Sequence, residues 1–247
     1  MRYVYCLIAL SFILSCTSNP PIPKRQHANE HFLLGDAYLK EGNILGALRE
    51  LSLAKEADQD NPDIHHELGL VYMALDDYIK AKKEFERAIS LRPNYSEAYN
   101  SFGLLYFRQG RWKKAEEYFK EALSNVLYAT PEDAYTNLGF CYLVQKKYKK
   151  ALAAFKSAIQ NKRECAPAYL GMGQTLEALG QDLEALNMYN LAAQYAPENP
   201  EVYYRLGNVC IKLGKRDDAI EALEKAVALD PVGGWGKRAK SLLKDLD

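Results

Sequence analysis

The stretch "YNSFGLLYFRQGRWKKAEEYFKEAL", residues 99–123, contains two apolar periodicities separated by a short polar turn. The first has the spacing i, i+3, i+4, i+7 of one helix face and consists of Tyr99, Phe102, Gly103 and Tyr106. The second has the spacing i, i+4, i+7 and consists of Ala115, Phe119 and Ala122. Between them, Gly110 is suited to a left-handed helix cap. The stretch therefore predicts two helices joined by a tight turn, with small residues where the helices approach closely.

The same pattern recurs along the chain. Glycines fall at positions 35, 69, 103, 139, 173 and 207, at intervals of 34, 34, 36, 34 and 34 residues. Alanines at 47, 81, 115, 151, 185 and 219 keep these intervals, as do alanines at 54, 88, 122, 158, 192 and 226. A fixed period of this length is typical of a repeat architecture. One unit cannot bury its apolar face, whereas six stacked units form a continuous core.

The period and the placing of its small residues resemble the tetratricopeptide repeat, a helix-turn-helix unit. The resemblance implies an all-α fold: a right-handed solenoid of six tetratricopeptide repeats followed by a capping helix. The expected repeats cover residues 28–61, 62–95, 96–131, 132–165, 166–199 and 200–233. The capping helix is expected over residues 234–247, where Ala239, Leu242, Leu243 and Leu246 share one face.

The N-terminus indicates export. Arg2 precedes about twelve mostly apolar residues, a run typical of a signal peptide and short of the about 20 residues of a transmembrane helix. The segment that ends at Cys16 resembles a bacterial lipobox, which implies a signal peptide over residues 1–15 and lipidation of Cys16. Alternatives are an ordinary signal peptide or a short uncleaved anchor. Thr17, rather than an acidic residue, follows Cys16, and the resemblance to enteric lipoproteins implies outer-membrane sorting with the protein facing the periplasm. Residues 16–27 are expected to form a lipidated, proline-containing tether.

The composition bears on the partner class and on the state of the cysteines. Lys plus Arg and Asp plus Glu number 32 each, which argues against nucleic acid as the main partner. The cysteines beyond position 16 are Cys141, Cys165 and Cys210, which have no C-x-x-C spacing. We interpret them as buried, unpaired thiols, although two of them could pair.

No catalytic motif is present. The chain lacks the phosphate-binding, zinc-protease and nucleophile-elbow patterns, so we expect no enzyme activity, no cofactor, no metal and no small-molecule substrate. His27 and His31 have i, i+4 spacing, but His31 and His65 occupy a repeat position where later units carry tyrosine. We interpret both as aromatic substitutes in a packing slot. The basic run 146–150 is interpreted as a solvated outer face.

The function is therefore expected to lie on a surface. In tetratricopeptide repeats, positions 9 and 12 of the first helix line the inner groove. In units two to four these positions are all apolar, and they predict an exposed partner-binding stripe: Leu70, Met73, Leu104, Phe107, Phe140 and Leu143. The alternatives are that a tightly curved solenoid covers its own groove, or that residues 17–27 fold into it.

The one irregular interval narrows the resemblance. Two extra residues lie between Ala122 and Gly139, in a join that carries Leu127 and Tyr128. A lipidated N-terminus, a short tether, six repeats and this longer join together resemble the type IV pilus biogenesis lipoproteins of the PilF/PilW type, the pilotins. The resemblance implies an outer-membrane factor that assembles and stabilises the pilus secretin by protein–protein binding. The alternative is a general periplasmic scaffold lipoprotein for another envelope or secretion complex.

Overall fold

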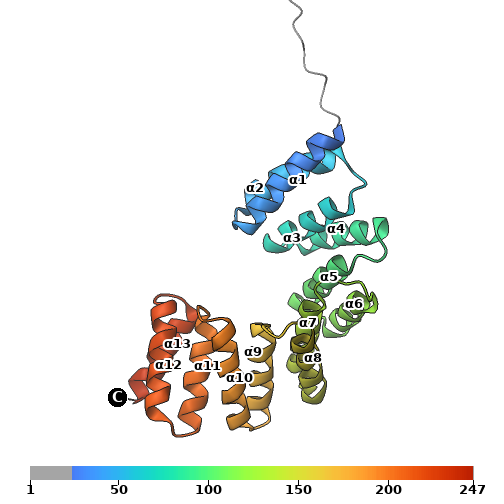
Figure 1. Cartoon of the computed structure of the whole chain (residues 1–247). Coiled ribbons are helices and arrows are strands. Elements are labelled where there is room, and N and C mark those ends of the chain that lie inside the picture. Colours follow the sequence, from blue (N-terminus) through green and yellow to red (C-terminus); the bar gives the residue numbers. More distant parts are fainter. Residues whose placement is uncertain (1–23, 247) are drawn as a thin grey trace, which may run out of the picture.

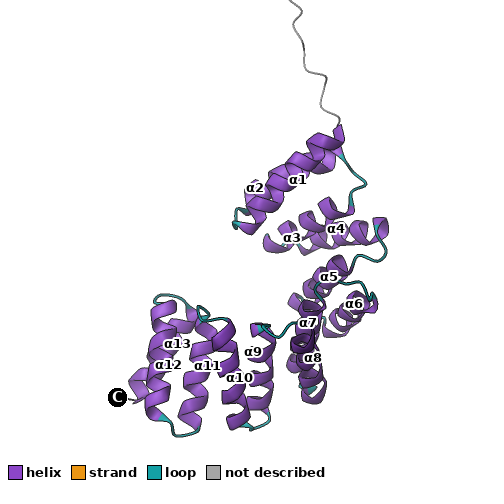
Figure 2. Cartoon of the chain, viewed as in Figure 1, coloured by secondary structure: helices purple, strands orange, loops and turns teal. Residues whose placement is uncertain are grey.

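The computed structural model describes residues 24–246, so the expected signal peptide and the expected lipidation site at Cys16 lie outside the described residues. The described chain consists of thirteen helices joined by turns, with no strand among these residues (Figures 1 and 2). They are α1 (Lys24–Lys40), α2 (Ile44–Ala57), α3 (Pro62–Ala74), α4 (Tyr78–Leu91), α5 (Ser96–Arg108), α6 (Trp112–Ser124), α7 (Pro131–Val144), α8 (Tyr148–Asn161), α9 (Ala166–Ala178), α10 (Asp182–Tyr195), α11 (Pro200–Lys212), α12 (Arg216–Leu229) and α13 (Gly234–Leu246).

The helices form six helix-turn-helix pairs that stack along the chain, and α13 closes the far end (Figure 1). This confirms the all-α solenoid of six units. Two boundaries differ from expectation. Helix α1 begins at Lys24, so the last four residues of the expected tether are helical, and α7 begins at Pro131, one residue early. Proline suits this first helical position because its missing N–H has no intrahelical acceptor there.

Each unit is held by a large side chain packed on a glycine. The side chain of Phe119 on α6 is fully buried, and a Cβ added to Gly103 on α5 would lie 2.6 Å from its ring carbon Cδ1. Non-bonded carbon atoms essentially never approach so closely, so any larger residue at Gly103 would force the ring or the helices to move. The equivalent side chains of all six units are fully buried: Leu51, Phe85, Phe119, Phe155, Tyr189 and Leu223.

The turn inside each unit requires a left-handed residue. Gly42, Gly110, Gly180 and Gly214 have φ between 70° and 77° at this position. Units two and four place Asp76 and Lys146 there instead, each with φ of 57°. A left-handed residue with a Cβ costs about 1–2 kcal/mol relative to glycine, so these two turns are strained.

The end of the solenoid is covered as the sequence predicts. Ala239 on α13 is fully buried in a cluster with Leu223 and Ala226 of α12, and Leu242, Leu243 and Leu246 pack against the same cluster. Among residues 24–246, no helix combines the length and the apolar character needed to cross a bilayer.

The three repeat cysteines are buried and unpaired, which confirms their interpretation as small apolar residues. Burial raises the pKa of the Cys141 thiol to about 11, so this side chain stays neutral at physiological pH.

Candidate functional site

The first helix of each pair lies on the inner side of the solenoid. Each second helix packs on its own first helix and on the first helix of the next pair. Consecutive first helices also contact one another directly, as α3 and α5 and then α5 and α7 do. Elements on the inside of a curve lie closer together than those on the outside, so these contacts place the first helices on the inside. The six predicted stripe residues lie on these inner helices, as the repeat register requires.

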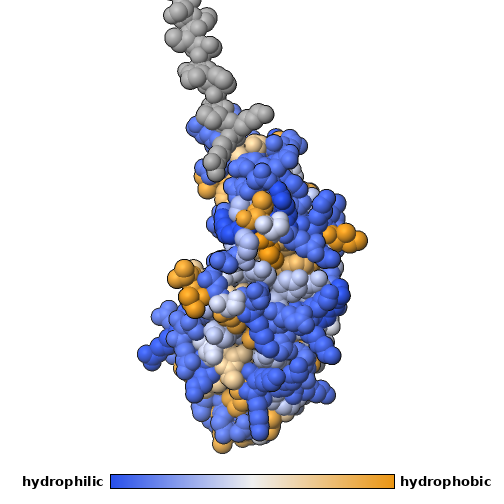
Figure 3. All heavy atoms as spheres, turned by 90° about the vertical axis from the view of Figure 1, so that its right-hand side faces the viewer, coloured by the Kyte–Doolittle hydropathy of each residue, from blue (hydrophilic) through white to orange (hydrophobic). Residues whose placement is uncertain are grey.

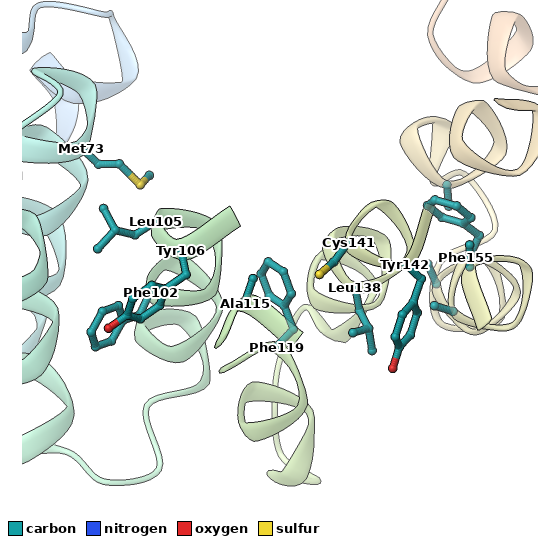
Figure 4. Close-up of a cluster of buried hydrophobic side chains, with 14 of the residues drawn as sticks. Met73, Phe102, Leu105, Tyr106, Ala115, Phe119, Leu138, Cys141, Tyr142 and Phe155 are labelled. Atoms are coloured by element: carbon teal, nitrogen blue, oxygen red, sulfur yellow. The ribbon is translucent and has the colours of Figure 1, made fainter. Parts of the chain in front are cut away.

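The stripe is less exposed than the sequence analysis expects. Five of its members are half-buried and pack against the large central cluster: Leu70, Leu104, Phe107, Phe140 and Leu143. Met73 is only 5% exposed and belongs to that cluster, together with Leu105 and Tyr106 of the next unit (Figure 4). The prediction that Met73 faces solvent is therefore wrong. The contact of α3 with α5 covers the end of α3, and position 12 of this unit becomes core.

The two phenylalanines of the stripe are also tied to the core. The ring of Phe140 meets the ring of the fully buried Phe155 edge to face, with 5.1 Å between centroids. Phe107 meets Trp112 in the same manner, at 5.1 Å. Such contacts fix the ring orientations. These side chains can offer one face to a partner while the other stabilises the repeat.

A hollow of about 560 Å³ lies beside Phe140 and is mostly polar. Its lining includes Asn100 and Asn137, whose side chains are joined by a 3.0 Å hydrogen bond from Nδ2 of Asn137 to Oδ1 of Asn100. Asp133 also lines it, and burial together with the neighbouring Glu132 raises the pKa of Asp133. The groove therefore combines an apolar stripe with hydrogen-bonding groups at unit four, a feature that the analysis of positions 9 and 12 alone missed.

The inner side changes character in units five and six. Glu177 accepts hydrogen bonds from Tyr189, Asn208 and Lys212, at distances of 2.7, 3.1 and 2.5 Å. Burial alone would raise the pKa of Glu177, but the hydrogen bonds from Lys212 and Tyr189 outweigh it and lower that pKa. Position 12 is thus apolar in units two to four and an ionised carboxylate in unit five. A ligand along the whole groove would meet apolar side chains in units two to four and polar ones, including the carboxylate of Glu177, in unit five.

The irregular join between α6 and α7 has a defined shape. Asn125 donates from Nδ2 to the backbone oxygen of Asn94, and its Oδ1 accepts from the backbone N–H of Leu127. Tyr128 is 8% exposed and anchors the join, whereas Val126 and Leu127 are 95% and 85% exposed. Figure 3 shows isolated apolar side chains of this kind standing out from a largely hydrophilic face. The join is a second candidate contact surface.

The repeat histidines form hydrogen bonds to carboxylates. Nδ1 of His31 lies 2.7 Å from Oε2 of Glu50, and Nδ1 of His65 lies 2.6 Å from Oε2 of Glu84. The interpretation as aromatic packing substitutes therefore missed their polar partners. Within the part of the chain that the structure describes, no group of three or more histidines, cysteines and carboxylates could hold a metal ion.

Comparison with protein families defines the class. Models described as tetratricopeptide repeat match residues 60–126, 132–165, 166–199 and 200–231, and a model described as TPR repeat matches residues 35–76. Together these matches cover well over half of the chain. The protein belongs to the tetratricopeptide repeat family, whose members are generally scaffolds for protein interactions.

Among solved structures, the chain is similar to pilF of Pseudomonas aeruginosa, with a TM-score of 0.76 and 22% identity over 90% of this chain and 99% of that one. It is also similar to PilW, a type IV pilus biogenesis factor, with a TM-score of 0.78 and 23% identity over 88% and 99% of the two chains. Cut9 in the Cut9–Hcn1 complex of the APC/C gives a TM-score of 0.79 and 18% identity, over 92% of this chain and 44% of that one. No curated protein sequence matches the chain. At these identities the likeness shows the fold.

Proposed function

We propose that the chain is a lipid-anchored outer-membrane protein that assembles and stabilises a type IV pilus secretin by binding the secretin subunit in its inner groove. One observation carries the proposal. The alignments with pilF and PilW run through 88–90% of this chain and 99% of those chains, so the similarity extends over nearly the whole of both chains. The alignment with Cut9 uses only 44% of that chain.

The inner groove supports this role. Its apolar stripe offers half-buried anchors on the first helices of three consecutive units, α3, α5 and α7, and a few such anchors usually dominate the energy of an interface. Leu104 on α5 and Leu143 on α7 are suited to hold an apolar face of a helix or a short extended segment laid along the inner helices. Nothing in this arrangement calls for a catalytic step, a cofactor or a small-molecule substrate.

The test is binding and assembly of the secretin in cells that carry the chain. We expect pull-down of the chain to recover the secretin, and deletion of its gene to remove secretin multimers from the outer membrane. Leu104→Asn with Leu143→Asn should abolish both binding and multimers. The matched control is Ile89→Asn with Ile159→Asn, which changes half-buried aliphatic residues of the outer helices α4 and α8.

The control separates binding from stability. Both double variants are expected to lower the melting temperature by similar amounts, because both lose apolar packing at half-buried sites. Normal secretin multimers in the deletion strain would overturn the proposal. Recovery of a different envelope complex in the pull-down would favour a general periplasmic scaffold instead.

A further inference from the structure

The turns inside units three and four form a strongly basic surface. We define the basic turn patch as eight cations, all exposed: Arg108, Arg111, Lys113, Lys114, Lys146, Lys147, Lys149 and Lys150. No acidic residue lies within residues 108–115 or 145–151. The corresponding turns of units one, two, five and six each contain at least one acidic residue, among them Glu41, Asp77, Asp182 and Asp217. The chain as a whole is balanced, so this patch is a local concentration of charge.

Six of the eight cations stand at the N-terminal ends of α6 and α8, where they oppose the helix dipole. The other two, Arg108 and Lys146, lie at the C-terminal ends of α5 and α7, where positive charge is favourable. Helices α6 and α8 begin at Trp112 and Tyr148, and neither has an acidic residue in its first turn nor a side-chain hydrogen bond at its N-cap. By contrast, α4 is capped by the side chain of Asp77, and α12 has two aspartates in its first turn. Positive charge at a helix N-terminus is unfavourable. We therefore expect the six cations at these N-termini to lower the stability of units three and four in the free protein.

Four of the eight cations are held in place by tyrosine rings. Arg111 and Lys114 lie 5.0 and 5.3 Å from the ring centroid of the buried Tyr106. One unit further on, Lys147 and Lys150 lie 5.7 and 5.5 Å from the ring centroid of Tyr142. Two equivalent turns therefore repeat the same ordered geometry. The equivalent pair of unit two, Lys80 over the ring of Tyr72 at 5.2 Å, has it as well, so the repeat itself orders cations at this position.

Part of the patch is maintained in spite of backbone strain. Lys146 has φ of 57° where four other units have glycine. Lysine gains nothing locally from this conformation, unlike aspartate, whose short side chain can form local hydrogen bonds there. In addition, Lys113 and Lys149 form no ion pair with any described residue. Their charge is available to a partner.

Exposed aliphatic side chains flank the patch. Val144, at the end of α7, is 47% exposed and lies two residues from Lys146. The turn of unit two presents Leu75 and Ile79 at 41% and 85%, and the turn of unit five presents Leu179 and Leu183 at 44% and 61%. Basic side chains at the centre, with apolar ones in the adjoining turns, match the two contributions to interfacial binding: attraction to anionic headgroups and burial of apolar surface at the acyl boundary.

We propose that the basic turn patch docks on an anionic phospholipid surface. The patch lies on the turns, whereas the proposed secretin site lies on the inner helices. The two surfaces adjoin at Phe107, which contacts Trp112 of the turn, and the rest of each surface is free while the other is occupied. Docking there would orient the solenoid at a membrane and would offset the repulsion between the cations and the helix dipoles.

The test measures which lysines a membrane protects from chemical acylation. The full chain is bound to vesicles of phosphatidylcholine alone, or of equal parts phosphatidylcholine and phosphatidylglycerol, and lysine acylation rates are read by mass spectrometry. We expect acylation of Lys113, Lys114, Lys149 and Lys150 to slow several-fold on the anionic vesicles and to recover in high salt. Lys156 on α8 and Lys237 on α13, both exposed, report ordinary accessibility. Equal rates on the two vesicle types would overturn the proposal.

A pair of matched variants makes the test specific. Lys113→Glu with Lys149→Glu should remove the protection of Lys114 and Lys150 on anionic vesicles, whereas Lys156→Glu with Lys237→Glu changes the net charge equally and should keep it. Helical content is checked for both. If both variants lost the protection, binding to anionic vesicles would depend only on the net charge of the protein. That result would contradict docking through the basic turn patch. A third result would also contradict lipid docking. If soluble polyglutamate slowed acylation of the patch lysines in the presence of neutral vesicles, and anionic vesicles did not, the partner would be an acidic polypeptide and not a lipid surface.

Discussion

Nδ1 of His65 on α3 lies 2.6 Å from Oε2 of Glu84 on α4, and both side chains are almost fully buried. Nε2 of His65 lies 2.9 Å from the backbone oxygen of Gln59. Both ring nitrogens thus face oxygens that accept hydrogen bonds, and the imidazolium form can donate to both. Lys55 also donates to Glu84, at 2.7 Å. The pair bridges the two helices of unit two at a position where later units use only apolar packing.

The six units show that these two positions change together. Where the fourth position is His, the position nineteen residues later is Glu, and where it is Tyr, that later position is apolar or aromatic. The pairs are His31–Glu50, His65–Glu84, Tyr99–Tyr118, Tyr135–Ala154, Tyr169–Met188 and Tyr203–Ala222. The chain therefore uses two kinds of residue pair at one site of the repeat: a His–Glu pair, or a tyrosine with an apolar or aromatic residue.

This exchange gives the first prediction. His65→Tyr should lower the free energy of unfolding by about 1–3 kcal/mol, because Glu84 stays buried and loses a charge-assisted hydrogen bond. Adding Glu84→Ala, which reproduces unit four, should recover most of that loss. Urea unfolding of the single and double variants measures the coupling. Additive losses would contradict the pairing.

The second prediction concerns pH. Burial would raise the pKa of Glu84, but the hydrogen bonds from His65 and Lys55 outweigh it and lower the pKa below 4.5. A carboxylate with a lowered pKa stabilises the fold above its unfolded pKa, and this stabilisation is lost as pH falls through the folded value. We therefore expect the difference in unfolding free energy between the parent and Glu84→Gln to shrink as pH falls below about 4.5. A constant difference from neutral to acidic pH would show that folding leaves the pKa of Glu84 unchanged, and it would contradict this prediction.

The third prediction tests the close approach inside a unit. Gly103→Ala adds a Cβ at 2.6 Å from the ring of the fully buried Phe119, so the ring or the helices must move. Overpacking of this kind costs about 1–3 kcal/mol. Gly234→Ala is the control, since a Cβ at that position meets nothing within 4 Å. If Gly103→Ala had the same melting temperature as the parent protein, the repeat register would be wrong.

The fourth prediction uses the strained turn of unit four. Lys146→Gly should raise the unfolding free energy by about 1 kcal/mol, because glycine adopts φ of 57° without the Cβ clash. Lys146→Ala removes the same charge but keeps the Cβ, so it should give much less of this gain. Equal gains from both variants would assign the effect to charge repulsion rather than to the backbone.

The sequence predicted the fold well because repetition makes each signal appear six times. The glycine and alanine series located every helix pair, and the face of Ala239 and Leu242 located the cap. The candidate site was predicted less completely. The register predicts that position 12 is open to solvent, but the contact between α3 and α5 buries Met73. Burial of an inner position depends on how closely successive units stack, and the one-dimensional register does not contain that information.

The polar partners were missed for a different reason. His65 shares its repeat position with Tyr99 and Tyr135, which predicts aromatic packing there, but the polar partner lies at a different repeat position on the second helix. Reading the fourth position together with the one nineteen residues later would have revealed Glu84. The same holds for Glu177, whose partner Lys212 lies one unit further along the chain.

The last prediction separates the two phenylalanines of the groove. Phe140→Glu should destabilise the fold by about 3 kcal/mol or more, because it removes the edge-to-face contact with the buried Phe155 and places a carboxylate against the central cluster. Phe107→Glu should cost less, since its ring contact is with the half-buried Trp112 at the turn, where a carboxylate can reach water and lies near Arg108 and Arg111. Circular dichroism melting of the two single variants measures the difference. A double variant with the parent melting temperature would show that both rings are free surface, and equal large losses would show that both are core. The expected order, with Phe140 costlier than Phe107, identifies Phe107→Glu as the variant that can probe partner binding in a folded protein.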